Sequence, residues 1–534
     1  MTTNEQTCPP SGSARSRIIL ERRHFQHWPP GLPHSLRAPD KLRLHDLLWR
    51  RARETPAKPL LYFEDRTLSY AEAAAAAERL AGHLQSACGV GPGDRVLLDM
   101  QNGPDFVIAC FAILRADAVV VPLSPMNLAQ ELAHYAADSG AKVAIAEAEL
   151  ATRFGSALQV VVPGVTTLAE HAMAPSRSKA ADLAMMPYTS GSTGKPKGCM
   201  HTHATMLHNI VGAVAWKDIT ASTVALATAP FFHVTGLIHS FLATVYSGGT
   251  MAIQQRWDPV LAAQLVERHR CTHWDNVPTM VVDLLSHPQA LQHDVSSLKS
   301  IFGGGAAMPE AIARKLFDTC GVHYIEGYGM TETISQTHMN PVQRPKKQCL
   351  GIPTFDTESL VIDPDSFRVL EPGASGEILV RGPQLLTGYW QKEAAYRESW
   401  VEIDGKAYFR TGDLGRMDED GYFYISDRLK RMINAAGFKV WPAEVEAAMY
   451  RHPAIKECCI IAAPDERRGE TVKAVVVLKP GHAASAEDIL AWARGEMAAY
   501  KAPRRIEFSD ALPRTPSGKL MWRALQDSEW ASKP

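Results

Sequence analysis

The feature that most constrains the fold is a regular alternation of short apolar runs with helical segments in the N-terminal part of the chain. Residues 95–100, 118–122 and 142–146 have the length and composition of buried strands, and residues 104–116 and 127–139 have those of the helices between them. Strands separated by helices of this length usually pair in parallel, because a parallel neighbour requires a long crossover connection. The pattern predicts an α/β fold built on parallel sheets.

The pattern changes after about residue 358. Short strands expected at residues 359–363, 376–381 and 422–425 are separated by turns, which predicts a small antiparallel barrel or sheet. Helices and strands then follow in a final unit, for which we expect a small α+β domain. The predicted division is an N-terminal arm (1–40), a large N-terminal domain (41–427), a hinge (428–431) and a C-terminal domain (432–534).

The composition excludes several classes of protein. A length of 534 residues is too great for one hydrophobic core, and a net charge of -1 gives no support for a nucleic-acid partner. The nine cysteines include no C-x-x-C pair, so neither a zinc site nor a disulfide framework is indicated, and a reducing cytosol fits. The most apolar segment, residues 106–122, carries Arg115 and Asp117 and is shorter than a membrane span. We expect a cytoplasmic protein with no integral membrane segment and no secretory signal.

A loop rich in glycine and hydroxyl residues occupies positions 188–198, with the sequence YTSGSTGKPKG. Unshielded backbone N–H groups, hydroxyls and ammonium groups suit a polyphosphate. We expect a strand before this loop at residues 183–186 and a helix from residue 200, which would place an anion at a helix N-terminus. The spacing is not that of a Walker A motif, and a plain surface loop is the alternative.

Four further clusters follow in order. They are GGGAA at 303–307, YIEGYGMTE at 324–332, YFRTGD at 408–413 and LPRTPSGK at 512–519. Taken singly, the first is typical of a strand–helix turn and the last of a solvated surface lysine. Asp413 after a glycine turn is suited to holding ribose hydroxyls.

Together these clusters resemble the adenylate-forming (AMP-binding) superfamily, which includes acyl-CoA synthetases, luciferase-type enzymes and peptide-synthetase adenylation domains. The resemblance covers residues 45 to 525 approximately. It implies an acid–thiol ligase that uses ATP, Mg²⁺ and coenzyme A. A carboxylic acid and ATP would give an acyl-adenylate and pyrophosphate, and the CoA thiol would then displace AMP.

The resemblance also implies roles for individual residues. Lys519 would bridge the carboxylate and the α-phosphate, Thr331 would bind that phosphate, and Glu332 would coordinate Mg²⁺. His233 belongs to the motif at the acyl entrance and completes the catalytic set. The positions implied for ATP and CoA are Thr189, Ser190, Gly191, Ser192, Thr193, Gly194, Lys197, Gly305, Ala306, Ala307, Gly327, Tyr328, Gly329, Met330, Asp413, Arg428, Lys430, Gly437, Phe438 and Lys439. A positive group between two anions has an evident purpose, because it offsets their repulsion as they react.

The second step requires a different arrangement of the domains. By resemblance, the C-terminal domain is mobile and rotates about Lys430, and the loop at 435–439 then lines a tunnel for the pantetheine arm. Many relatives carry a second glycine where this chain has Ala436. A solvated basic linker is the alternative interpretation of residues 428–431.

The acid itself is less constrained by the sequence. The expected pocket positions are Phe232, Val234, Leu237, Trp274, Asn276, Gly303, Gly304 and Ile334. They are mostly apolar with no evident counter-charge, which favours an apolar acyl chain. Residues 25–33 and 433–442 resemble bacterial medium- and long-chain fatty acyl-CoA ligases, so fatty acids are the first prediction.

Several alternatives stay open. Trp274 and Met330 could flank a ring, which would suit an arylalkanoate or aromatic acid. The acceptor could be a separate carrier protein instead of CoA. A luciferase-like oxidase and a catalytically silent binding protein are further alternatives, the last opposed by the intact motif residues. A monomer and a homodimer are both compatible with the sequence.

Overall fold

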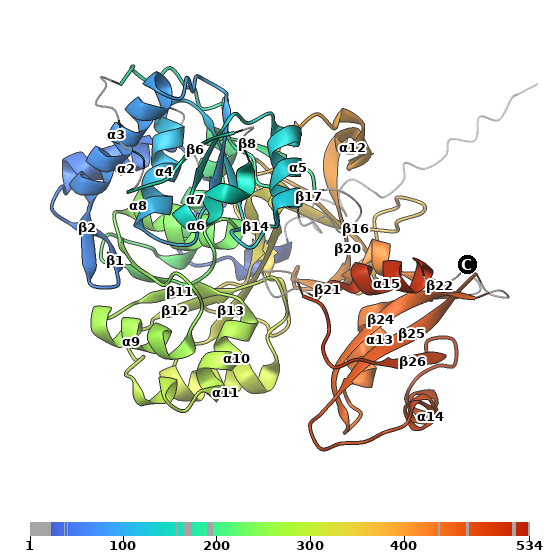
Figure 1. The fold of residues 1–534 in the computed structure, drawn as a ribbon. Coiled ribbons are helices and arrows are strands. Elements are labelled where there is room, and N and C mark those ends of the chain that lie inside the picture. Colours follow the sequence, from blue (N-terminus) through green and yellow to red (C-terminus); the bar gives the residue numbers. More distant parts are fainter. Residues whose placement is uncertain are drawn as a thin grey trace, which may run out of the picture.

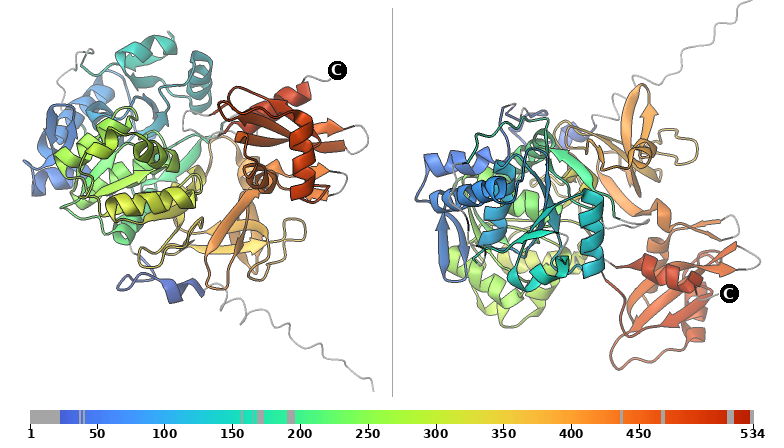
Figure 2. Two further views of the ribbon diagram at one scale, coloured as in Figure 1. Left: turned by 90° about the horizontal axis from the view of Figure 1, so that it is seen from below. Right: turned by 45° about the horizontal axis from the view of Figure 1, so that its top comes forward.

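The computed structural model describes residues 23–36, 38–39, 41–155, 158–164, 166, 168, 173–189, 196–435, 438–465, 469–514 and 520–531. A large body formed by the first two thirds of the chain carries an antiparallel sheet and then a C-terminal unit, which stands to one side of the body (Figure 1). The further views show the same separation, with the C-terminal unit next to the strands of the antiparallel sheet (Figure 2).

Two mainly parallel sheets form the body. The first has the order β15-β14-β13-β12-β11-β9-β10-β1-β2 and the second β18-β8-β7-β4-β3-β5-β6. The strands of the first sheet are β1 (Pro59–Phe63), β2 (Arg66–Ser69), β9 (Val224–Ala227), β10 (Thr250–Ile253), β11 (His273–Asn276), β12 (Ser300–Gly303), β13 (Tyr324–Met330), β14 (Ser335–Met339) and β15 (Ile352–Pro353). Those of the second are β3 (Arg95–Asp99), β4 (Val119–Leu123), β5 (Val143–Ala146), β6 (Gln159–Val161), β7 (Leu183–Met185), β8 (Cys199–Thr202) and β18 (Gly388–Tyr389). The predicted α/β class is confirmed.

Helices cover these sheets and bury their apolar faces with them in several separate core clusters. They are α2 (Asp46–Glu54), α3 (Tyr70–Ser86), α4 (Pro104–Arg115), α5 (Ala129–Ser139), α6 (Ala148–Ala151), α7 (His203–Lys217), α8 (Ala243–Ser247), α9 (Pro259–His269), α10 (Pro278–Ser286) and α11 (Glu310–Cys320), with a π-helix, η3 (Gly236–Leu242). The start of α3 shows how the sequence fixes such a helix. The Ser69 hydroxyl accepts from the Glu72 backbone N–H, and the Glu72 carboxylate accepts from the Ser69 N–H, so two otherwise unpaired donors are satisfied.

The prediction of a helix from residue 200 was wrong. Residues 199–202 form β8, which runs antiparallel to β7 and also pairs with β18. Helix α7 begins only at His203, where the hydroxyl of Thr202 caps it by accepting from the Thr205 N–H. The loop at 189–198 therefore joins two strands of a hairpin, and no helix N-terminus follows it directly.

The next unit is an antiparallel sheet, as predicted for this part of the chain. Its order is β16-β17-β20-β19, with β21 paired to β20. The strands are β16 (Glu358–Ile362), β17 (Gly376–Arg381), β19 (Trp400–Ile403), β20 (Lys406–Met417) and β21 (Phe423–Arg428), and α12 (Glu393–Glu398) precedes β19. Asp413 on β20 lies opposite Arg428 on β21, at the point where the chain leaves this sheet.

The C-terminal unit has its own sheet and its own core. Its elements are β22 (Ile433–Ala435), β23 (Phe438–Val440), α13 (Pro442–Met449), β24 (Ile455–Asp465), β25 (Gly469–Leu478), α14 (Ala486–Glu496), β26 (Arg505–Phe508) and α15 (Trp522–Ala531). Val440, Val445, Ile460 and Val476 are buried together in the core. This is the mixed helix–strand composition expected for the end of the chain.

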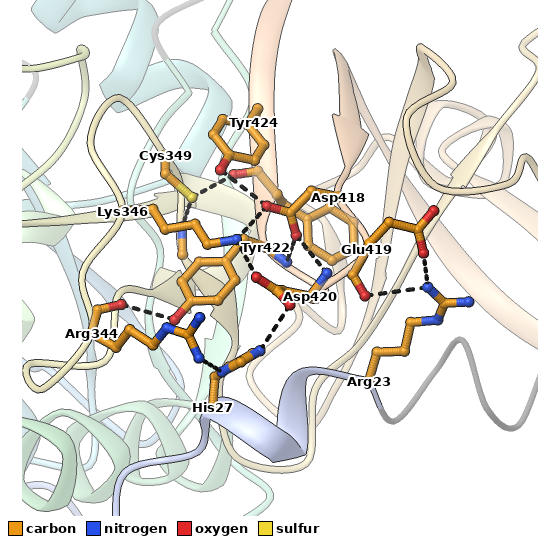
Figure 3. A network of polar contacts seen from close by, with 12 residues as sticks. Arg23, His27, Arg344, Lys346, Cys349, Asp418, Glu419, Asp420, Tyr422 and Tyr424 are labelled. Carbon is orange, nitrogen blue, oxygen red and sulfur yellow. Dashed lines mark hydrogen bonds and ion pairs between the residues drawn. The ribbon is translucent and has the colours of Figure 1, made fainter.

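The N-terminal segment packs on the body. Trp28, after the 3₁₀ turn η1 (Arg23–His27), meets Trp216 and Phe355 edge to face at centroid distances of 5.0 and 5.3 Å. Figure 3 shows the polar contacts beside it, where Arg23 bonds Glu419 in the β20–β21 turn. The segment therefore joins α7 to the antiparallel sheet.

Among the described helices, none is long and apolar enough to cross a bilayer.

Candidate active site

A cavity of about 830 Å³ lies where the body, the antiparallel sheet and the C-terminal unit meet. Its wall includes residues at the carboxyl ends of β4, β11, β12 and β13, which is where α/β sheets usually bind ligands. Arg428 and Leu429 contribute from the junction between the units, and Met521 and Trp522 from the C-terminal unit. The cavity is thus closed partly by residues far apart in the sequence.

At one end of the cavity, two lining residues, Tyr328 and Arg428, hold the carboxylate of Asp413, which lies behind the cavity wall. The hydroxyl of Tyr328 donates to Asp413 Oδ2, and Nε of Arg428 lies 2.8 Å from Asp413 Oδ1. Asp413 is fully buried, and its charge raises the pKa of the Arg428 guanidinium. Burial raises the pKa of Tyr328 well above its usual value, so its hydroxyl keeps its proton. The carboxylate is thereby fixed in place at the end of β20.

A second group connects the glycine-rich loop to β13. The hydroxyl of Tyr389 donates to Glu332 Oε1 at 3.0 Å, and the ammonium of Lys197 lies 4.4 Å from the centre of the Tyr389 ring. On β8, His201 donates from Nε2 to the backbone oxygen of Thr331 at 2.8 Å. Burial lowers the pKa of His201 to about 4, so the imidazole is neutral. The backbone of Thr331 is therefore held by β8, the strand that follows the glycine-rich loop.

The stem of the loop is closed by hydrogen bonds. Thr189 N–H donates to Lys197 O at 2.9 Å, and Lys197 N–H donates to the Thr189 hydroxyl at 3.2 Å. The Tyr188 hydroxyl donates to Asp138 at 2.8 Å, which ties the stem to α5. Thr189 and Lys197 both line the cavity. The stem therefore fixes both ends of the loop at the cavity edge.

Glycines are required where β12 and β13 approach neighbouring chain segments. A Cβ added at Gly329 would lie 1.7 Å from Ser335 O, and one at Gly303 would lie 1.8 Å from the Tyr324 hydroxyl. No larger residue fits either position without moving its neighbours. The turn between β13 and β14 is held by Asn209, which donates from Nδ2 to the carbonyl oxygens of Thr333 and Ile334.

The structure brings many of the predicted residues to the cavity and separates others from it. Those that line it are Thr189, Lys197, Phe232, His233, Val234, Gly303, Gly304, Gly305, Gly327, Tyr328, Gly329, Met330, Thr331, Glu332 and Arg428. Leu237, Trp274, Asn276 and Ile334 are buried in the core away from the cavity wall, and Ala306 and Ala307 are exposed outside it. Ser190, Gly191, Ser192, Thr193, Gly194, Gly437 and Lys519 lie outside the described residues, and only the backbone of Lys430, Phe438 and Lys439 is described.

The described residues that follow Lys519 reach the cavity. Arg514 and Leu520 form an isolated antiparallel bridge, and Met521 and Trp522 line the cavity. Residues two and three positions after the lysine thus lie at the site.

The pocket positions expected from the sequence are mostly apolar, but the cavity wall also includes charged residues that the sequence did not indicate. Lys217, the last residue of α7, forms a buried ion pair with Asp275 on β11, and both line the cavity. Nζ of Lys217 lies 3.0 Å from Nδ1 of His239, and Nε2 of His239 lies 2.9 Å from the Ser335 hydroxyl. Sequence reasoning missed all four residues. The one available signal was a lysine directly after the apolar run at residues 210–216 of α7.

The described residues contain no cluster of three His, Cys, Asp or Glu side chains able to hold a metal ion. Mg²⁺ does not need one, because it commonly binds one or two carboxylates together with substrate phosphates. The carboxylate of Glu332 on the cavity wall, beside the loop stem, fits that mode of binding.

A cavity at the carboxyl ends of parallel strands, closed by a small C-terminal unit, is the arrangement of a two-domain nucleotide-binding enzyme. Two family models match the chain, AMP-binding enzyme over residues 48–390 and AMP-binding enzyme C-terminal domain over residues 444–519. The chain belongs to the AMP-binding enzyme family.

Its relatives are CoA ligases. A feruloyl-CoA synthase from Amycolatopsis sp is 37% identical over 88% of this chain and 96% of the relative. A long-chain-fatty-acid–CoA ligase from Bacillus subtilis (strain 168) is 33% identical over 94% of this chain and 97% of the relative. The chain is therefore an AMP-forming acyl-CoA ligase.

Solved structures support the same fold. ATP-bound MatB from Rhodopseudomonas palustris is 28% identical, matches 92% of this chain and 100% of its own, and has a TM-score of 0.83. The apo form of MatB, with the same identity and coverage, has a TM-score of 0.71. The chain as a whole therefore superimposes better on the ATP-bound form.

Proposed function

We propose that the chain activates an aromatic carboxylic acid with ATP and transfers it to coenzyme A at this cavity. The observation that carries the choice of acid is the polar wall formed by Lys217, Asp275, His239 and Ser335. An alkyl chain packed there would offer the Ser335 hydroxyl no acceptor for its proton, whereas a ring that carries an oxygen substituent would. The relationship to a feruloyl-CoA synthase supports the same choice.

Fatty acids are the second candidate. The relationship to a long-chain-fatty-acid–CoA ligase favours them, as does the apolar surface of Phe232, Val234 and Met330. Both candidates use the same two reaction steps.

In the first step, the acid's carboxylate attacks the α-phosphate and pyrophosphate leaves. Thr189 and Lys197, with the loop between them, would hold the β- and γ-phosphates, and Thr331 would donate to the α-phosphate. Lys519 would lie between the two anions and neutralise their repulsion. Mg²⁺ bound by Glu332 would supply further positive charge at the phosphates. A carboxylate is already ionised at neutral pH, so this step needs no general base.

The nucleoside would lie across β13 and β20. Tyr328 would stack on the adenine beside Gly305, Ala306 and Ala307 at the end of β12. Asp413 would accept from the ribose hydroxyls, with Arg428 supporting ribose and phosphate. The fixed position of the Asp413 carboxylate, between Tyr328 and Arg428, supports this assignment.

In the second step the CoA thiol displaces AMP from the acyl-adenylate. The C-terminal domain would rotate about Lys430, and Gly437, Phe438 and Lys439 would line the pantetheine tunnel. His233 would lie at the acyl entrance.

The eight described cysteines form no disulfide among themselves, which supports a reducing compartment, and we propose the cytoplasm.

The test is pyrophosphate release measured over aryl acids and saturated fatty acids from acetate to stearate, with and without CoA. Release with aryl acids, and thioester formation that requires CoA, is the expected result. Efficient use of fatty acids alone would replace the first candidate by the second. Acyl transfer to a carrier protein in place of CoA would identify a stand-alone adenylation enzyme.

A further inference from the structure

The buried residues Lys217, Asp275, His239 and Ser335 form a continuous chain of contacts, defined here as the polar relay. They come from α7, β11, η3 and β14, which are separate elements of the body. Each is less than a tenth exposed and each lines the cavity. None of them has a part in the two reaction steps described above.

The direction of the hydrogen bonds follows from the chemistry of the groups. An ammonium can only donate, so Nδ1 of His239 accepts from Lys217. Burial lowers the pKa of His239 to about 3, with the nearby charge of Lys217 adding to the effect, so the ring is neutral. Its one proton is then on Nε2 and is donated to the Ser335 oxygen. The Ser335 hydroxyl can therefore donate its own proton to another acceptor, such as a ligand in the cavity.

The backbone of Ser335 is held in an unusual conformation. Its φ is 115°, and the preceding Ile334 has a φ of 45°, values that side-chain-bearing residues rarely adopt. Asn209 and the Thr333 hydroxyl, which donates to Ser335 O at 2.6 Å, fix this turn. Strain of this kind tends to occur at ligand-binding positions. It is an observation independent of the polar relay.

A purely structural role is the competing explanation for the buried ion pair. Such pairs rarely add stability, because the cost of removing two charges from water offsets their attraction. Lys217 and Asp275 also lie on the cavity wall, where an apolar pair of similar size would suit an apolar ligand better. The position of the relay therefore favours recognition of a polar group.

We propose that the Ser335 hydroxyl donates a hydrogen bond to an oxygen substituent on the acyl part of the substrate, a hydroxyl or alkoxy group. His239, Lys217 and Asp275 are positioning residues that orient this donor. The inference rests on the proposed acid–CoA ligase function and adds a specificity-determining residue to it. An acid with a methyl group in place of the oxygen would leave the donor buried and unpaired.

The test compares pairs of acids of nearly equal shape. Cinnamic acids carrying a hydroxyl at position 3 or 4 are compared with their methyl analogues, and methoxy acids with ethyl analogues. We expect the oxygen-bearing acid of at least one pair to have a kcat/KM about tenfold or more higher. Ser335→Ala should bring this ratio close to one, mainly by raising KM for the oxygen-bearing acid, with little change for the methyl or ethyl acid.

Two further variants separate recognition from folding. Ser335→Gly removes the same hydroxyl and relieves the backbone strain, so it should lose the preference without losing stability. Ser240→Ala is the matched control, because Ser240 is fully buried on η3 beside His239 and lies outside the cavity wall. It should keep the preference.

The outcomes distinguish the two proposals. No pyrophosphate release with any acid would contradict the ligase function itself. Release with aryl acids, but with equal kcat/KM for oxygen-bearing and alkyl acids in the wild type, would overturn the role of Ser335. So would a preference that survives in both Ser335 variants.

Discussion

The hydroxyl of Tyr389 donates to the carboxylate of Glu332 at 3.0 Å, and the same ring lies beneath the ammonium of Lys197. Tyr389 belongs to β18. This strand pairs with β8, which directly follows the glycine-rich loop in the sequence. One aromatic side chain thus links the proposed Mg²⁺ ligand to the stem of the proposed phosphate loop. A change at any of the three is expected to affect the others.

Glu332→Gln should lower the rate of pyrophosphate release by about a hundredfold and shift its Mg²⁺ dependence to higher concentrations, because the amide lacks the charge that binds the ion. Tyr389→Phe should have a smaller effect in the same direction. Mg²⁺ titrations of the initial rate measure both. The exposed Glu371→Gln is the control, and an unchanged Mg²⁺ dependence in Glu332→Gln would contradict the assignment.

Asp413→Asn should raise KM for ATP about tenfold or more, because the amide is a weaker acceptor for ribose hydroxyls than a carboxylate. The variant also removes the partner of Arg428. The Arg428 side chain is 45% exposed, so the loss of stability should be only about 1 kcal/mol. Initial rates at varied ATP, together with thermal unfolding, separate the two effects. An ATP KM equal to that of the wild type would argue against the ribose role.

Lys519→Ala should abolish adenylation while sparing the reaction of CoA with a supplied acyl-adenylate, because its charge is needed only when carboxylate and phosphate meet. The two half-reactions are measured separately, by pyrophosphate release and by thioester formation. Lys456→Ala, an exposed lysine of the same unit, should leave both unchanged. Equal loss of both half-reactions would remove the proposed role of Lys519.

Acid should destabilise the fold below about pH 6.5, because several buried histidines have a depressed pKa. Burial lowers the pKa of His24, His45, His201 and His203 to about 4, and of His239 and His338 to about 3. The unfolded chain therefore binds more protons than the folded chain between about pH 6.5 and 4, and the free energy of unfolding falls as the pH falls through that range. Each histidine contributes roughly 1.4 kcal/mol per pH unit. Urea midpoints between pH 7.5 and 5 test this, and a flat profile would contradict it.

Trp28→Ala should lower the free energy of unfolding by about 3 kcal/mol, because it removes a large buried side chain between Trp216 and Phe355. The reaction steps should be little changed. Thermal or urea unfolding measures the effect, with Leu128→Ala at a side chain that is 70% exposed as the control. Equal stability of the two variants would show that the N-terminal segment is only loosely attached.

Most of the fold could be predicted from the sequence, because its strands and helices have clear hydrophobic periods and clear ends. The strand at 199–202 could not. Cys199, Met200, His201 and Thr202 have no strong intrinsic preference, and their conformation is set by pairing with β7 and β18, which are distant or separated by the loop.

The acyl pocket was harder to predict than the nucleotide end for a related reason. Trp274 and Asn276 were expected to line it, but side chains alternate along β11, so Asp275 faces the cavity and its two neighbours face the core. Lys217 and His239 reach the cavity from elements that no short motif marks. Tyr328 and Glu332, by contrast, could be predicted because they lie within a recognisable motif at residues 324–332.

The ion pairs of two arginines limit where the chain can turn. Arg428 directly precedes η6 (Leu429–Arg431), and Arg431 is its last residue. Arg428 is bonded to Asp413 of the antiparallel sheet, whereas Arg431 is bonded to Glu446 and to the Ile460 carbonyl within the C-terminal unit. Arg431 also lies 3.8 Å from Asp427 of β21, and Asp427 Oδ2 accepts from the Ala443 N–H at 2.7 Å, so one buried carboxylate spans the junction. A rotation about Leu429 and Lys430 would therefore have to break both contacts of Asp427, while the length of the connection would hardly change.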